Sequence, residues 1–111
     1  MDDAYVEAVL HRVKQVPAGR VTTYGELADA VGAGGPRLVG RVMSQHGAGV
    51  PWWRVVRADG SAPGFLVDSA ARHWRAEGTP LVERPDGRVR VDLRRAAADH
   101  LQPVPRGQRP R

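Results

Sequence analysis

The stretch TYGELADAVGAGGPRLVGRVMSQ, residues 23–45, predicts two short helices joined by a glycine-rich turn. Thr23 and Glu26 have the spacing of a capping box, which opens a helix that runs to about Val31. Pro36 suits the first position of the next helix, which continues to the end of the stretch. This pattern is typical of a helix-turn-helix, although many small helical domains share it.

The second of these helices sorts its residues onto two faces. The apolar ones can face a core: Leu38, Val39, Val42 and Met43. Arg37, Arg41 and Ser44 stand at i, i+4 and i+7 and form a second stripe. A basic stripe of this kind suits a helix that faces a nucleic acid, and it suits a solvated charged face equally well.

The flanking sequence predicts further elements on both sides. Before the stretch, residues 3–16 carry apolar side chains at the spacing of one helical face. After it, the end of residues 50–56 reads as a buried strand or turn, and Asp68 or Ser69 can cap a helix that ends at Glu77. The remaining segments are a hairpin at 81–91, an Ala-rich helix at 93–101 and a Pro- and Arg-rich tail at 102–111, for which we expect disorder.

These elements indicate a mostly helical α/β fold with a winged-helix-like helix-turn-helix and a small sheet. A chain of 111 residues suits one compact domain, which we place at residues 1–101. The chain is basic, with 17 Lys and Arg against 12 Asp and Glu, and Lys14 is the only lysine. Arginine suits planar contacts with phosphates and bases, so the charge makes the chain a nucleic-acid candidate. A basic surface that only aids solubility explains the charge as well.

The composition also excludes several functions. The chain has no cysteine, so disulfides, thiolate chemistry and cysteine-based metal sites are excluded. The four histidines are scattered and suggest neither a metal site nor a triad. The first residues lack the pattern of a signal peptide, and no apolar run reaches membrane-spanning length. We therefore expect a monomeric cytoplasmic protein that has no cofactor and no membrane partner.

Four motifs, in order, resemble the DNA-binding domain of the O6-alkylguanine-DNA alkyltransferases. VPAGRVTTYGELA at 16–28 resembles the opening of that domain, and RLVG at 37–40 resembles the Arg-Ala-Val-Gly of its recognition helix. PWWRVV at 51–56 resembles the Pro-Cys-His-Arg-Val-Val active site, and Glu77-Gly78 matches the Glu-Gly after the next helix. Each motif alone is weak, but the shared order and spacing make the resemblance specific.

Trp52 stands where these enzymes carry the acceptor cysteine. That substitution is the hallmark of the alkyltransferase-like proteins, the non-enzymatic branch of the family. The resemblance therefore implies a protein that binds O6-alkylguanine in double-stranded DNA, flips the base into a pocket and directs nucleotide-excision repair proteins to it. It implies no catalytic residue and no metal.

The resemblance also assigns residues to two sites. The implied lesion pocket is formed by Pro51, Trp52, Trp53, Val55 and Phe65. The implied DNA-binding residues are Thr23, Tyr24, Arg37, Gly40, Arg41, Ser44 and Arg54. Arg37 matches the arginine that fills the space left by the flipped base, and Tyr24 matches the tyrosine that presses on the neighbouring phosphate. The structural alternatives remain open: Trp52 and Trp53 can pack in the core, and Arg54 can be an internal hydrogen-bond donor.

The chemistry of alkyl transfer is not available to these residues. Transfer needs a thiolate activated by a neighbouring base. Trp52 has no nucleophilic atom, and the indole of Trp53 only donates a hydrogen bond. In the family, a glutamate orients the histidine that follows the acceptor cysteine. Glu77 matches that glutamate, but Trp53 replaces the histidine. We therefore expect Glu77 to accept a hydrogen bond from Trp53 or from a backbone N–H.

Three departures from the family bear on the shape of the pocket. Tyr24 and Arg37 are one residue closer than in the family, and the loop before Pro51 lacks the asparagine of the enzymes. The Gly-Tyr-x-Gly-Gly loop becomes GFLVD at 64–68. Two other classes stay open: a general DNA-binding helix-turn-helix protein without lesion specificity, and an alkyltransferase or glycosylase.

Overall fold

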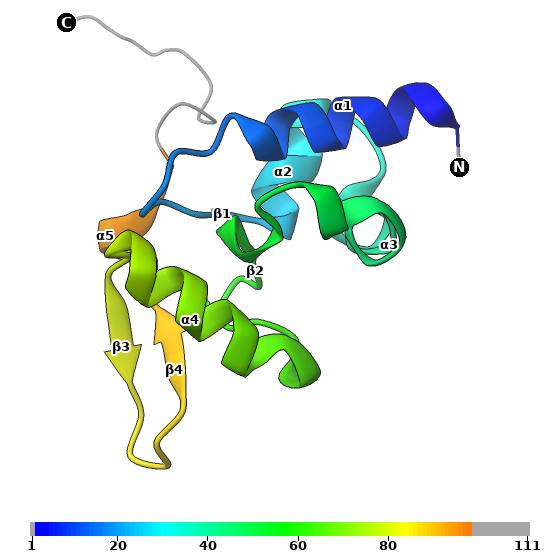
Figure 1. Ribbon diagram of the computed structural model, residues 1–111. Coiled ribbons are helices and arrows are strands. Elements are labelled where there is room, and N and C mark those ends of the chain that lie inside the picture. The colour runs from blue at the N-terminus through cyan, green and yellow to red at the C-terminus, as the bar shows by residue number, and fades with distance from the viewer. Residues whose placement is uncertain (1, 99–111) are drawn as a thin grey trace, which may run out of the picture.

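The computed structural model describes residues 2–98, and helices make up most of them (Figure 1). The helices are α1 (Asp3–Lys14), α2 (Tyr24–Val31), α3 (Gly35–His46), α4 (Val67–Glu77) and α5 (Leu93–Ala96). The strands are β1 (Thr22–Thr23), β2 (Val55–Val56), β3 (Leu81–Glu83) and β4 (Val89–Val91). The mostly helical α/β fold class is confirmed.

The first three helices enclose one of the cores of the fold. Its fully buried side chains come from all three helices: Val9 and Val13 from α1, Leu27 from α2, and Val39 and Val42 from α3. On α2 the capping box is present, because the Glu26 N–H donates to Thr23 Oγ1 and the Thr23 N–H donates to the Glu26 carboxylate. The predicted helix-turn-helix is therefore formed by α2 and α3.

The turn between α2 and α3 needs glycine. Gly32 ends α2 at φ 90°, and Gly34 precedes α3 at φ 91°, a backbone region that side chains disfavour. A Cβ on Gly34 would lie 2.2 Å from the hydroxyl of Tyr5, which donates to the Ala33 carbonyl. The turn is thus held against α1 by Tyr5.

A short parallel pair of strands connects two distant segments. β1 pairs with β2 in the register Thr22↔Val55 and Thr23↔Val56. Because the pair is parallel, the start of α2 lies beside Arg57, and the turn Trp52–Arg54 that precedes β2 lies beside the chain that leads into β1. The sequence predicted a buried strand or turn at the end of residues 50–56 but not its pairing with β1.

The C-terminal half forms the second core around α4 and a hairpin. β3 and β4 are antiparallel, with Leu81 opposite Val91, as the predicted hairpin requires. Trp74 of α4 is fully buried against the hairpin and β2, in a cluster with Val56, Val89 and Val91. The hairpin extends away from the helices like a wing (Figure 1).

Three helix boundaries differ from the sequence prediction. α1 ends at Lys14 rather than at Val16. α4 begins at Val67 without a side-chain cap, so neither Asp68 nor Ser69 caps it; a 3-10 turn at Gly64–Leu66 leads directly into the helix instead. α5 ends at Ala96 rather than near 101, because Ala97 is extended and the chain pairs with Val21 on both sides of it. The predicted tail at 102–111 lies outside the described residues. Within residues 2–98, no helix is long and apolar enough to cross a membrane.

Candidate nucleic-acid interface

A cavity of about 330 Å³ lies between α3, the Trp52–Arg54 turn and the loop before α4. Its lining is mostly apolar and aromatic: Tyr24, Gly40, Met43, Ser44, Gly47, Ala48, Trp52, Trp53, Val55, Ala62, Pro63, Phe65 and Leu66. A concave apolar site with few polar groups is the usual form of a small-molecule or base-binding pocket. The cavity joins residues that are 42 positions apart in sequence, from Tyr24 to Leu66.

Two tryptophans form an aromatic wall of the cavity, and a histidine packs against them. The rings of Trp53 and His73 are stacked, with centroids 3.6 Å apart and planes inclined by 5°. Trp52 stands edge-on to both, at 5.6 Å from Trp53 and 5.8 Å from His73. Trp52 is only partly buried and lines the cavity, so its ring both packs on the core and faces the space where a ligand would lie.

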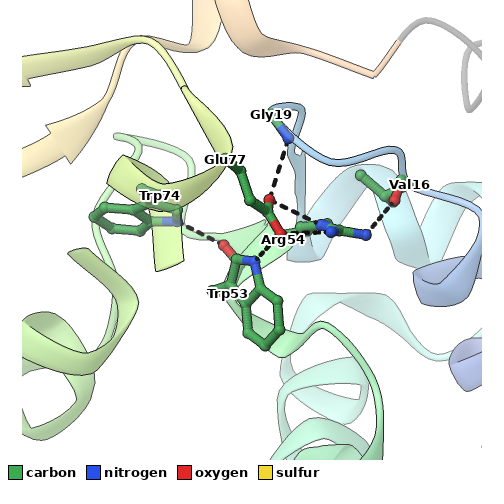
Figure 2. A network of polar contacts seen from close by, with 6 residues as sticks. All are labelled: Val16, Gly19, Trp53, Arg54, Trp74 and Glu77. Carbon is green, nitrogen blue, oxygen red and sulfur yellow. Dashed lines mark hydrogen bonds and ion pairs between the residues drawn. The ribbon is translucent and has the colours of Figure 1, made fainter. Parts of the chain in front are cut away.

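Glu77 is the centre of a polar network behind this wall (Figure 2). Its carboxylate accepts from Trp53 Nε1 at 3.0 Å, from the Gly19 N–H at 3.1 Å and from Arg54 Nε at 3.1 Å. Arg54 Nη2 also forms an ion pair with Glu77 Oε2. The expected contact between Glu77 and Trp53 is therefore present, and Trp53 is fixed at both ends, since its carbonyl accepts from Trp74 Nε1 at 2.7 Å.

The pKa of Glu77 lies below its ordinary value. Burial acts to raise this pKa, but the hydrogen bonds from Arg54, Gly19 and Trp53, together with the positive charge of Arg54, more than offset it. Glu77 is thus an ionised acceptor at neutral pH. It cannot serve as a proton donor there, and its four hydrogen bonds from three residues indicate a structural role.

The side chain of Arg54 points into the protein and not toward the surface on which we expected DNA to bind. Its side chain is only 16% exposed, its Nε and Nη2 bind Glu77, and its Nη1 donates to the Val16 carbonyl at 2.9 Å. The assignment of Arg54 to DNA contact is corrected on this ground, because contact with phosphate would break a largely buried ion pair. The alternative of an internal hydrogen-bond donor is the one that the structure shows.

A wider groove of about 840 Å³ adjoins the cavity. Thr23, Tyr24, Arg37 and Gly40 line it, as do Arg57 and Pro63 from the loop after β2. Tyr24, Gly40 and Pro63 are shared by the groove and the cavity. Burial raises the pKa of the Tyr24 hydroxyl, partly offset by the charge of Arg57, so this hydroxyl stays protonated and can donate.

Most of the other predicted site residues lie around the cavity and the wider groove. Arg37, Arg41 and Ser44 are exposed along α3, as their stripe predicted, and Ser44 reaches the cavity. Trp52, Trp53, Val55 and Phe65 line the cavity, with Phe65 90% exposed at its edge. Pro51 does not line the cavity; it precedes the turn that carries the two tryptophans. A Cβ added to Gly40 would meet nothing within 4 Å, so this stretch of α3 is open to close approach.

Sequence reasoning missed several residues of the site. Met43 packs against the core, as predicted, but it also lines the cavity, which the sequence did not indicate. Pro63, which lines the cavity, and His73, which stacks on Trp53, come from segments with no motif of their own. Only the packing of α4 and the preceding loop brings them there. Across residues 2–98, no three His, Asp or Glu side chains gather as a metal site would require.

Comparison with known proteins explains this arrangement. Residues 4–79 match the model of the 6-O-methylguanine DNA methyltransferase DNA-binding domain. The chain belongs to that family. The resemblance noted from the sequence motifs is thereby confirmed.

The relatives that this chain matches include base-flipping proteins and a structure solved with damaged DNA. A "DNA base-flipping protein" of Vibrio parahaemolyticus is 33% identical over 86 residues, which cover 73% of this chain and 86% of the relative. One from Escherichia coli is 36% identical over 101 residues, covering 85% and 74%. The crystal structure of S. pombe Atl1 with damaged DNA containing O6-carboxymethylguanine superposes with a TM-score of 0.75 at 26% identity, covering 87% of this chain and 96% of Atl1.

Proposed function

We propose that this protein binds O6-alkylguanine in double-stranded DNA, flips the base into the cavity and holds it without transferring the alkyl group. The observation that carries the proposal is Trp52, whose ring lines the cavity at the motif position of the family's acceptor cysteine. An indole carbon framework cannot accept an alkyl group as a thiolate does. Binding and repair chemistry are therefore separated in this chain.

The surrounding geometry supports binding in the manner of a base-flipping protein. Removing a base from the stack costs a few kcal/mol, and aromatic contact returns about 1–3 kcal/mol per base. The cavity offers Trp52 for that contact, and Phe65 lies at its edge. Arg37 is exposed at the start of α3, where we propose that it enters the stack, while the protonated Tyr24 hydroxyl donates to the adjacent phosphate.

The open space beside Gly40, which has no side chain of its own, supports docking of α3 in the minor groove. Thr23, Arg41 and Ser44 are the further contacts that we propose along this face. We propose that the protein acts as a monomer in the cytoplasm and marks the lesion for nucleotide-excision repair proteins. The family resemblance is the sole support for these last steps.

The first test compares two duplexes that differ by a single O6-methyl group. We expect tighter binding to the methylated duplex, because flipping a guanine out of a weakened base pair costs less free energy. Fluorescence anisotropy at fixed salt measures the ratio of the two Kd values. Equal affinities would favour a general DNA-binding helix-turn-helix protein. In a parallel incubation with labelled lesion, movement of label to protein or release of a free base would show an enzyme.

The second test concerns the charge of the alkyl group. Among residues 2–98, no cationic side chain lines the cavity, and Arg54, which lies next to the Trp53 ring, is paired with Glu77. A buried carboxylate without a partner costs more than a neutral group. We therefore expect O6-carboxymethylguanine to bind at least about tenfold more weakly than a neutral alkyl lesion of similar size.

Competition against one labelled duplex measures this ratio. The carboxymethyl lesion is the informative one, because S. pombe Atl1 was crystallised with DNA that contains it. Equal competition by the charged and neutral lesions would contradict the idea that an apolar cavity holds the alkyl group.

A further inference from the structure

A third hollow, of about 360 Å³, lies between the loop after β2 and the β3–β4 hairpin. Its lining is dominated by arginine: Arg57 from the loop and Arg84, Arg88 and Arg90 from the hairpin. We call this hollow the hairpin groove. Two aspartates also line it, Asp59 and Asp86, so the charged side chains sum to four positive and two negative, or +2.

The two aspartates are occupied by local turns. Asp59 accepts from the Ser61 hydroxyl at 2.6 Å and from the Ser61 N–H at 3.0 Å, and these bonds hold the pKa of Asp59 below its usual value. Asp86 accepts from the Arg88 N–H at 3.0 Å. Within the described part of the chain, no carboxylate lies within 4.0 Å of the nitrogens of the four groove arginines. Their guanidinium groups are thus available to an external anion.

The hairpin groove continues the interface already described. Arg57 lines both this groove and the wider one that holds Tyr24 and Arg37. Its charge is also felt at the Tyr24 hydroxyl. Arg57 therefore connects the wider groove with the hairpin groove. An extended polyanion bound in the wider groove could continue along the arginines of the hairpin groove. Guanidinium groups bind phosphate oxygens in a bidentate manner, which suits a row of phosphodiesters.

We propose that the hairpin groove binds the sugar–phosphate backbone of the DNA that flanks the flipped base. In this arrangement Arg57 and the hairpin arginines position the duplex but do not read the lesion. The proposal rests on the proposed function only in that DNA is the ligand; it does not depend on lesion recognition.

The test is the salt dependence of DNA binding by the double variant Arg88→Ala/Arg90→Ala. Each lost phosphate contact makes the negative slope of log K against log salt shallower by about 0.9, so two lost contacts make it shallower by about 1.8. We expect weaker binding to methylated and intact duplexes by the same factor, with their ratio unchanged. The matched control is Arg72→Ala/Arg94→Ala, which removes the same charge from exposed positions outside the groove.

Each outcome of this test decides one way. A shallower slope in the groove variant alone supports the proposal. An unchanged slope, or a slope that becomes equally shallower in both variants, overturns the proposal. The groove would then bind a different anion, or the effect would come from the net charge of the protein alone. A changed ratio of lesion to intact binding also overturns it, because the groove would then take part in recognition. Failure of the proposed function instead shows in the unsubstituted protein, as equal binding of the two duplexes, and leaves the slope comparison valid.

Discussion

Replacing Glu77 by alanine is expected to lower the free energy of unfolding by about 3 kcal/mol, the lower end of the cost of breaking a buried ion pair. The carboxylate is 14% exposed and its partner Arg54 is 16% exposed, so the guanidinium would be left largely desolvated and without its charge partner. The Trp53 and Gly19 N–H groups would lose their acceptor as well. For a domain of this size, such a loss lowers Tm by about 12–24 °C.

Thermal unfolding followed by circular dichroism at neutral pH measures this effect. Glu83→Ala is the matched control, since that carboxylate is 77% exposed and lies 4.0 Å from Arg75. An exposed pair of this kind contributes at most about 1 kcal/mol. A Tm for Glu77→Ala close to that of the control would show that the network does not support the fold.

The same network predicts how stability depends on pH. The folded-state pKa of Glu77 is below its ordinary value of 4.5, so the unfolded chain binds this proton more readily than the folded one. The stabilising contribution is therefore complete above the unfolded-state pKa and is lost as the pH falls from about 4.5 through the folded-state value. The difference in Tm between the unsubstituted protein and Glu77→Gln should shrink over that acid range. A constant difference would contradict the assignment.

Replacing Trp52 by alanine is expected to abolish most of the preference for the alkylated duplex. Aromatic contact with a base is worth about 1–3 kcal/mol, which corresponds to a loss of about 5- to 150-fold in the ratio of Kd values. The salt-sensitive background binding should persist, because Arg37, Arg41 and the rest of the α3 surface are unchanged. Anisotropy titrations with methylated and intact duplexes give the ratio directly.

A second variant keeps this test decisive. Trp52 also packs edge-on against Trp53 and His73, so alanine removes part of the core as well as the wall of the cavity. Trp52→Phe retains an aromatic ring and should keep most of the preference. If both variants fold and both bind the two duplexes in the same ratio as the unsubstituted protein, Trp52 does not contact the flipped base.

Local sequence patterns predicted most of the helices and the hairpin. The capping box at Thr23 and Glu26 starts α2, and the glycines that end α2 and α4 adopt the left-handed backbone that few other residues tolerate. The boundaries that failed depend on distant contacts. α5 ends early because its chain pairs with Val21, more than seventy residues away, and no local signal announces such a pairing.

By itself, the sequence determined what this protein can do chemically. Without a cysteine, and with Trp52 and Trp53 in the motif, the chain has no thiolate to alkylate, whatever its fold. Only the tertiary structure decided which side chains share a surface. The β1–β2 pair sets Tyr24 beside the cavity, Glu77 draws Arg54 inward, and the hairpin brings its arginines to Arg57. These contacts join residues far apart in the chain, so they depend on how helices and strands pack rather than on the spacing of residues along any one of them.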